Sequence, residues 1–173
     1  MRKEERKDFV YNNLPDKPNG WRIEVPSSED RVSSCSPGRF TLYEKAFEFG
    51  FRIPLTEFQV KLTNYFRVTP AQLLPNSWRV IVAFEALCLH LHLRPTPTLF
   101  HQFYTVKGLG GWWFVTKQPK APMKLFDGLD SSTSAAQWKA RYWMVSAAEG
   151  SYPPFWSYWC APIHTRGSSA PQV

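Results

Sequence analysis

The longest apolar pattern in the chain runs from Thr69 to Leu93. Thr69 and Gln72 have the spacing of a capping box around Pro70, and Pro75-Asn76 then breaks and restarts the chain. Between Asn76 and Leu93 the only polar residues are Ser77, Arg79, Glu85, His90 and His92. A helix with so little polar surface must be surrounded by other elements. We therefore expect a central buried helix, and not a membrane span, because Arg79 and Glu85 interrupt its apolar run.

Shorter amphipathic patterns flank this helix and predict further helices. Residues 40–50 place Phe40, Tyr43, Ala46 and Phe47 on one face, after a cap at Ser36-Pro37 and before a stop at Gly50. Residues 56–67 begin with a capping box at Thr56 and Gln59 and repeat Phe58, Leu62, Tyr65 and Phe66 at helical spacing. After Arg94-Pro95, a cap at Thr96-Pro97 predicts a short helix with an apolar stripe of Leu99, Phe100, Phe103 and Tyr104.

The pattern changes from helical to extended at the glycine cluster 108–111. Three β-rich runs follow, separated by turn residues: Trp112 to Thr116, Met123 to Phe126 and Trp138 to Val145. The predicted fold is therefore α+β, a mostly helical core of four to five helices around the central helix, followed by a small antiparallel β-sheet.

Three segments are expected along the chain. Residues 1–35 mix charges with prolines and predict a flexible segment, pinned locally at Trp21-Arg22-Ile23. Residues 36–149 form the globular domain, and 150–173 form a Pro- and aromatic-rich C-terminal segment with a disordered end. Three scattered cysteines and the lack of an apolar leader after Met1 predict an intracellular protein.

The positive charge lies mainly in the part expected to fold. The chain has a formal net charge of +7, and residues 40–173 supply +6 of it, with thirteen Lys/Arg against seven Asp/Glu. Such a balance favours an anionic partner, with nucleic acid ahead of an acidic protein or a membrane surface.

The predicted sheet offers the candidate surface for such a partner. Lys139, Arg141 and Trp143 share one face of the third strand, and Trp113, Lys117 and Lys124 can join them. Basic side chains between aromatic rings can neutralise phosphates while the rings stack on bases. The plainer alternative, favoured by the one wet face of most antiparallel sheets, is that both tryptophans face the helices and the cations lie at the rim.

Catalytic and metal chemistry have little support in the sequence. The acidic residues of the folded part are scattered, and the glycine cluster 108–111 lacks the Lys-Ser/Thr and helix of a phosphate loop. Cys88 with His92 and Cys160 with His164 match no zinc-finger spacing. We expect no enzyme activity, no metal, no cofactor and no small-molecule substrate.

Several sequence pieces, in this order, resemble one known family. They are LYEKAFEFGFRIPL, VTPAQLLPNSWRVIVAFEAL, PTLFHQFYTVK, GWWFV and WKARYWMV, between Leu42 and about Trp143. This combination resembles the gypsy-type transposon (transposase-like) domain family of plant transposable elements. The resemblance implies a non-catalytic, retrotransposon-type protein, gag-like or associated with nucleic acid. Residues 2–7 contain basic pairs interleaved with acids, which make a weak nuclear-import signal and are more typical of a solvated segment. The alternatives are a protein-protein interaction or self-association module derived from such an element, or a component of a transposase.

Overall fold

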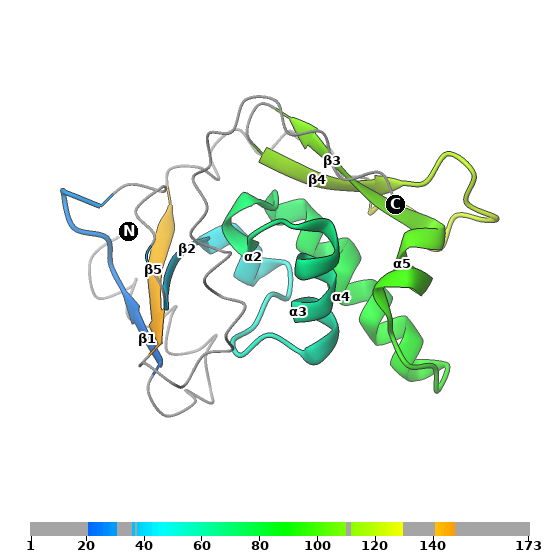
Figure 1. Cartoon of the computed structure of the whole chain (residues 1–173), viewed down its shortest axis with the longest axis horizontal. Helices are drawn as coiled ribbons and strands as arrows, with labels where there is room; N and C mark the ends of the chain where they lie inside the picture. The colour runs from blue at the N-terminus through cyan, green and yellow to red at the C-terminus, as the bar shows by residue number, and fades with distance from the viewer. Residues whose placement is uncertain (1–20, 31–35, 37, 110–111, 130–140, 148–173) are drawn as a thin grey trace.

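The computed structural model describes residues 21–30, 36, 38–109, 112–129 and 141–147. Within them it contains four α-helices, one 3-10 helix and two antiparallel sheets, so the α+β prediction is confirmed. Figure 1 shows the helices between the two sheets, with the three-stranded sheet at one end and the β3–β4 hairpin along one side.

The central helix is α4 (Pro75–His90), and Pro75 occupies its first turn, where the chain was predicted to break and restart. Trp78, Ile81 and Phe84 are buried along its length, and the Phe51 ring meets that of Trp78 edge-on with centroids 4.4 Å apart. Helix α2 and strand β4 contact α4. The expectation of burial is wrong for the last turn, where Leu89 is 63% exposed, because no described element packs there.

The predicted capping boxes begin two helical segments. Thr56 accepts a hydrogen bond from the Gln59 backbone and begins α3 (Glu57–Phe66). Thr69 and Gln72 make the same exchange around η1 (Pro70–Gln72), which leads into α4. Thr96 caps α5 (Pro97–Phe103) through the Leu99 backbone N–H. Each cap satisfies backbone donors that the first helical turn leaves free.

The helix predicted over residues 40–50 is only partly correct. Arg39–Tyr43 is strand β2, and the helix α2 is limited to Glu44–Glu48. All side chains from Phe40 to Tyr43 are buried, including Thr41, which does not belong to the apolar face of the predicted helix. A segment covered on both faces gains its stability from strand pairing rather than from one apolar stripe.

The three-stranded sheet joins distant parts of the chain in the order β1-β5-β2. Its middle strand β5 (Tyr142–Ala147) pairs antiparallel with β2 and with β1 (Trp21–Glu24), which is the segment expected to be pinned locally. Trp143, Met144 and Val145 of β5 are buried. Strands β1 and β5, from the two ends of the described chain, therefore pair with each other and complete the core.

The second sheet is the hairpin of β3 (Tyr104–Leu109) and β4 (Trp112–Lys117). The predicted strand at Trp112 is confirmed, but its partner is β3, which begins where the last predicted helix was expected to continue. Met123 to Phe126 is not a strand, and β5 lies in the other sheet. The single three-stranded sheet predicted from these runs is therefore wrong, because strand partners are set by long-range packing rather than by local pattern.

Candidate nucleic-acid interface

The β3–β4 hairpin has one face on the core and one face away from it. Residues directly opposite in an antiparallel pair lie on the same face. Val106 pairs with Val115 on the inner face, where both are buried, and the Val115 N–H donates to Ser77 Oγ of α4 at 3.0 Å. Lys107 pairs with Phe114 on the outer face, where the lysine is exposed and the ring is half-buried.

Trp113 lies on the inner face and has a structural role. Its ring lies over Gly108, where an added Cβ would be 3.6 Å from the indole. Its carbonyl accepts a hydrogen bond of 2.8 Å from the Leu74 N–H, just before α4 begins. Trp113 therefore fastens the hairpin to the helical core, which is the plainer of the two roles considered for it.

Lys117 and Lys124 do lie near each other in the fold. Lys117 ends β4, and Lys124 lies on the loop that follows it, and both line one pocket. Both side chains are exposed at this site. Lys124 also pairs with the carboxylate of Asp127 at 3.3 Å.

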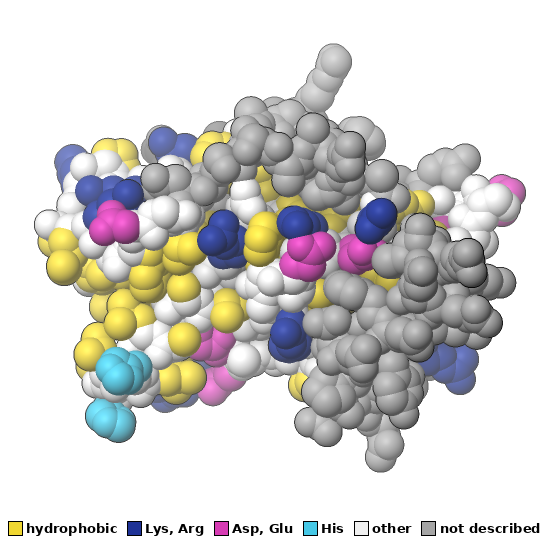
Figure 2. Space-filling model, turned by 180° about the vertical axis from the view of Figure 1, so that it is seen from behind, with side chains coloured by type: hydrophobic (Ala, Val, Ile, Leu, Met, Phe, Trp, Pro, Cys, Tyr) yellow, Lys and Arg dark blue, Asp and Glu magenta, His cyan; other side chains and the backbone are white. Residues whose placement is uncertain are grey.

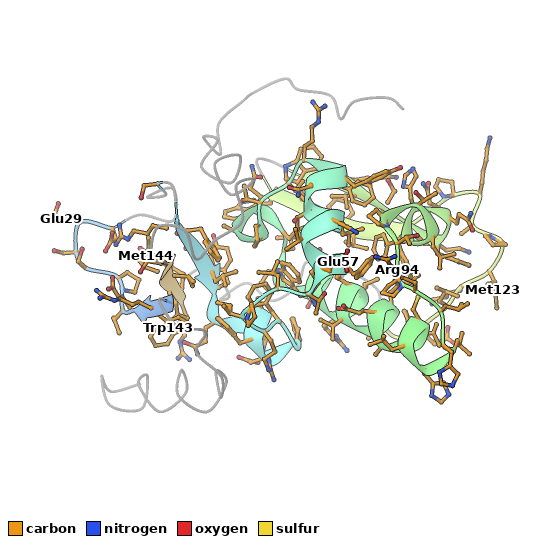
Figure 3. All side chains as sticks on the ribbon, turned by 60° about the horizontal axis from the view of Figure 1, so that its bottom comes forward. Glu29, Glu57, Arg94, Met123, Trp143 and Met144 are labelled. Carbon is orange, nitrogen blue, oxygen red and sulfur yellow. The ribbon has the colours of Figure 1, made fainter. Side chains whose placement is uncertain are left out.

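The predicted residues of the third strand lie elsewhere. Trp143 on β5 is only 3% exposed, so its ring cannot stack on a base, and this expected role is corrected. Arg141 precedes β5 and pairs with buried Glu44 at 3.3 Å. Lys139 lies outside the described residues. Figure 3 shows Trp143 and Met123 toward opposite ends of the molecule, so the six residues do not form one platform.

Two further lysines lie on the hairpin and the loop that follows it. Lys107 on β3 and Lys120 on the following loop are exposed, and neither forms an ion pair with any residue that the structure describes. A simple charge pattern could have identified them, since no acidic residue occurs between Glu85 and Asp127. Within that stretch the hairpin and its loop carry Lys107, Lys117, Lys120 and Lys124, which we call the hairpin lysines.

Two hollows lie beside these lysines. One has a volume of about 250 Å³ and is lined by Val80, Phe103, Tyr104, Val115, Thr116, Lys117, Met123, Lys124, Leu125, Phe126 and Leu129. The other is wider and shallower, at about 510 Å³, and is lined by His101, Gln102, Gln118, Pro119, Lys120 and Pro122. Neither is lined by a carboxylate, so both suit an anionic or neutral ligand.

The Cys88 and His92 pair does not converge on one point. Cys88 is buried in α4, where burial and the neighbouring charge of Glu85 raise the pKa of its thiol. His92 is exposed beyond the end of the helix. Among the residues that the structure describes, no three His, Cys, Asp or Glu side chains form a group able to hold a metal ion. Cys160 and His164 lie outside the described residues.

Comparisons with known proteins give one match. No curated protein and no solved structure matches the chain. Within the described residues, no helix combines the length and apolar character needed to cross a membrane. Residues 41–108, which run from β2 into β3, match a family model described as "Putative gypsy type transposon". The resemblance seen in the sequence is thereby confirmed over residues 41–108, which are similar to this family and which we call the family segment.

Proposed function

We propose that this chain is a non-catalytic nucleic-acid-binding domain of a transposable-element protein of the retrotransposon type, gag-like in role and acting in the plant nucleus. The observation that carries the proposal is the group of hairpin lysines on one hairpin and its loop, in a stretch without acidic residues. Lysines placed this way can replace the counterions that surround a phosphate backbone. The family segment supports the link to a transposable element.

The charges in this region favour nucleic acid over an acidic protein surface. Lys107, Lys117 and Lys120 have no carboxylate partner among the described residues, whereas Lys45 and Lys61 on the helical side pair with Glu48 and Glu57. A lysine without an intramolecular partner keeps its full charge for a ligand, while a paired lysine must first give up its partner. The hairpin and its loop are therefore where phosphates are expected to bind.

The test measures binding of a labelled DNA or RNA oligonucleotide across a range of salt concentrations. The variant Lys117→Gln with Lys120→Gln should lower affinity at low salt and reduce the slope of log affinity against log salt by about 1.4 to 1.8, since each of the two lost phosphate contacts contributes about 0.7 to 0.9. The matched control is Lys45→Gln with Lys61→Gln, which removes the same charge elsewhere. Absence of binding at low salt, or an equal loss in the control, would contradict the proposal.

A second candidate function, a protein-interaction module, is favoured by a different surface. Leu89, Leu91 and Leu93 at the end of α4 are 63%, 54% and 50% exposed, and we call these three leucines the α4-end patch. In Figure 2, hydrophobic side chains lie beside histidines at one corner of the molecule. Adjacent Arg94 pairs with Glu57 at 3.3 Å. Because copies of a chain with net charge +7 repel each other, an acidic partner with apolar side chains fits this patch better than a second copy.

A further inference from the structure

The smaller of the two hollows has the construction of a binding pocket for a flat ring. Its floor is formed by Val80 of α4 and Val115 of β4, which are both buried. Phe103, Tyr104 and Phe126 supply aromatic rings around it. The Tyr104 and Phe126 rings are nearly parallel, with 11° between their planes and 6.3 Å between centroids.

The rim of this pocket is basic and its outer edge is accessible. Lys117 and Lys124 line it from the end of β4 and from the loop, and both are exposed. Met123 is 59% exposed, and Figure 3 shows it at the outer edge of the molecule. The Asp127 carboxylate that pairs with Lys124 is itself almost fully exposed, so this ion pair costs little to exchange for a phosphate.

The size of the pocket limits what can enter it. A volume of about 250 Å³ lies below the roughly 300 to 1,000 Å³ typical of sites for drug-sized ligands, so a single ring system fits better than an extended molecule. An apolar floor, aromatic walls and cations at the rim match a ligand with a flat ring and a negatively charged group beside it. A nucleotide unit of a nucleic-acid strand has this chemistry.

We propose that this pocket receives one unpaired base of a single-stranded nucleic acid, while Lys117 and Lys124 contact the neighbouring phosphates. This inference rests on the proposed function and specifies its ligand. A duplex can offer phosphates to the lysines, but its bases are paired and stacked, and flipping one out costs a few kcal/mol. The pocket therefore selects single strands over duplexes, and selects strands that carry bases over strands that lack them.

The experiment compares three labelled probes of equal length by fluorescence anisotropy: oligodeoxythymidine, an abasic oligodeoxyribose phosphate and a DNA duplex. Stacking of one base on aromatic side chains should make the thymidine strand bind about 5-fold to 150-fold more tightly than the abasic strand. The duplex should bind more weakly than the thymidine strand. Phe126→Leu should reduce this advantage without changing affinity for the abasic probe, because the lysines remain.

Phe114→Leu is the matched control, since it makes the same change on the outer face of the hairpin. A second measurement needs no variant: a photoreactive 4-thiothymidine strand bound to the unaltered chain should crosslink to the residues that line the pocket, within 103–104 or 115–129. Crosslinks elsewhere, or a loss of affinity in Phe114→Leu instead of Phe126→Leu, would overturn the pocket assignment.

The outcomes separate this inference from the function on which it rests. Equal binding of the thymidine and abasic strands, with the salt dependence retained, would overturn base insertion and leave phosphate binding intact. Preference for the duplex would do the same. Absence of binding by all three probes at low salt would remove both proposals.

Discussion

Adding a single side-chain atom should destabilise the helical core most at Gly50. It follows α2 with φ +90°, and its N–H donates to the Phe47 carbonyl at 3.0 Å. A Cβ added there would lie 3.2 Å from Cγ1 of Val82 on α4. Glycine accepts positive φ without the steric cost that other residues incur, and the close approach to Val82 excludes a larger side chain as well.

Gly50→Ala should therefore lower the free energy of unfolding by about 1 to 3 kcal/mol, from positive φ and the contact with Val82 together. Chemical denaturation of both proteins measures this difference. Gly108→Ala is the control, because a Cβ there would lie at an ordinary 3.6 Å from the Trp113 ring. If Gly50→Ala were as stable as the unaltered chain, the close packing between the end of α2 and α4 would be wrong.

The sequence predicted the structure best at the scale of single residues. The capping boxes of Thr56 with Gln59 and Thr69 with Gln72 are present as predicted, because a cap needs only residues three positions apart. Gly50 also follows a helix, as predicted. The roles of Trp113 and Trp143 could not be assigned in this way, since a tryptophan pattern does not tell which face of a sheet is covered.

At the scale of elements, local periodicity failed where an element depends on a distant partner. Phe40, Tyr43, Ala46 and Phe47 have helical spacing, yet Phe40 and Tyr43 belong to β2, which pairs with β5 about a hundred residues later. Thr41 shows why the helical pattern failed, because its hydroxyl donates a hydrogen bond to the sulfur of Met144 on β5 inside the core. The hairpin lysines were only half identified, since Lys107 lies on β3, a strand that was not predicted, and Lys120 lies on the loop after β4.

Helix α4 was predicted correctly as an element. Its exposed end, however, indicates a binding surface rather than a part of the core. Replacing Leu91 and Leu93 together by serine should change the free energy of unfolding by about 1 kcal/mol at most, as is usual for exposed positions. Leu62→Ser is the buried control and should cost at least about 2 kcal/mol, because it removes core contacts and buries a hydroxyl group. Denaturation curves of the variants measure both effects.

The same double variant tests the second candidate function. A synthetic helical peptide with a leucine face and glutamate flanks should bind the unaltered chain and lose its affinity for Leu91→Ser with Leu93→Ser. The glutamates complement Arg94 beside the α4-end patch, and the leucines cover its apolar surface. Equal binding to both proteins, or none to either, would count against a docking role for this patch.

At the scale of the whole molecule, the core draws on residues outside the family segment. Within residues 41–108, β2 and β3 each lack a strand partner, since β2 pairs with β5 and β3 with β4. Val115, Trp143, Met144 and Val145 are all buried and all lie beyond residue 108. Long-range closure of this kind leaves no trace in a local pattern, so the sequence predicted the fold class but not the pairing that completes the core.

The family segment should therefore not fold by itself. A fragment of residues 41–108 would expose the inner faces of β2 and β3 and leave their backbone groups unpaired, which an isolated helical subset cannot offset. We expect it to lack a cooperative thermal transition by circular dichroism, whereas residues 21–147, which include all five strands that the structure describes, should retain one. Since three of the four hairpin lysines and all of β4 lie beyond residue 108, the short fragment should also lose salt-dependent binding of nucleic acid. A cooperative transition in the fragment of residues 41–108 would mean that β4 and β5 are additions to a core that is already complete.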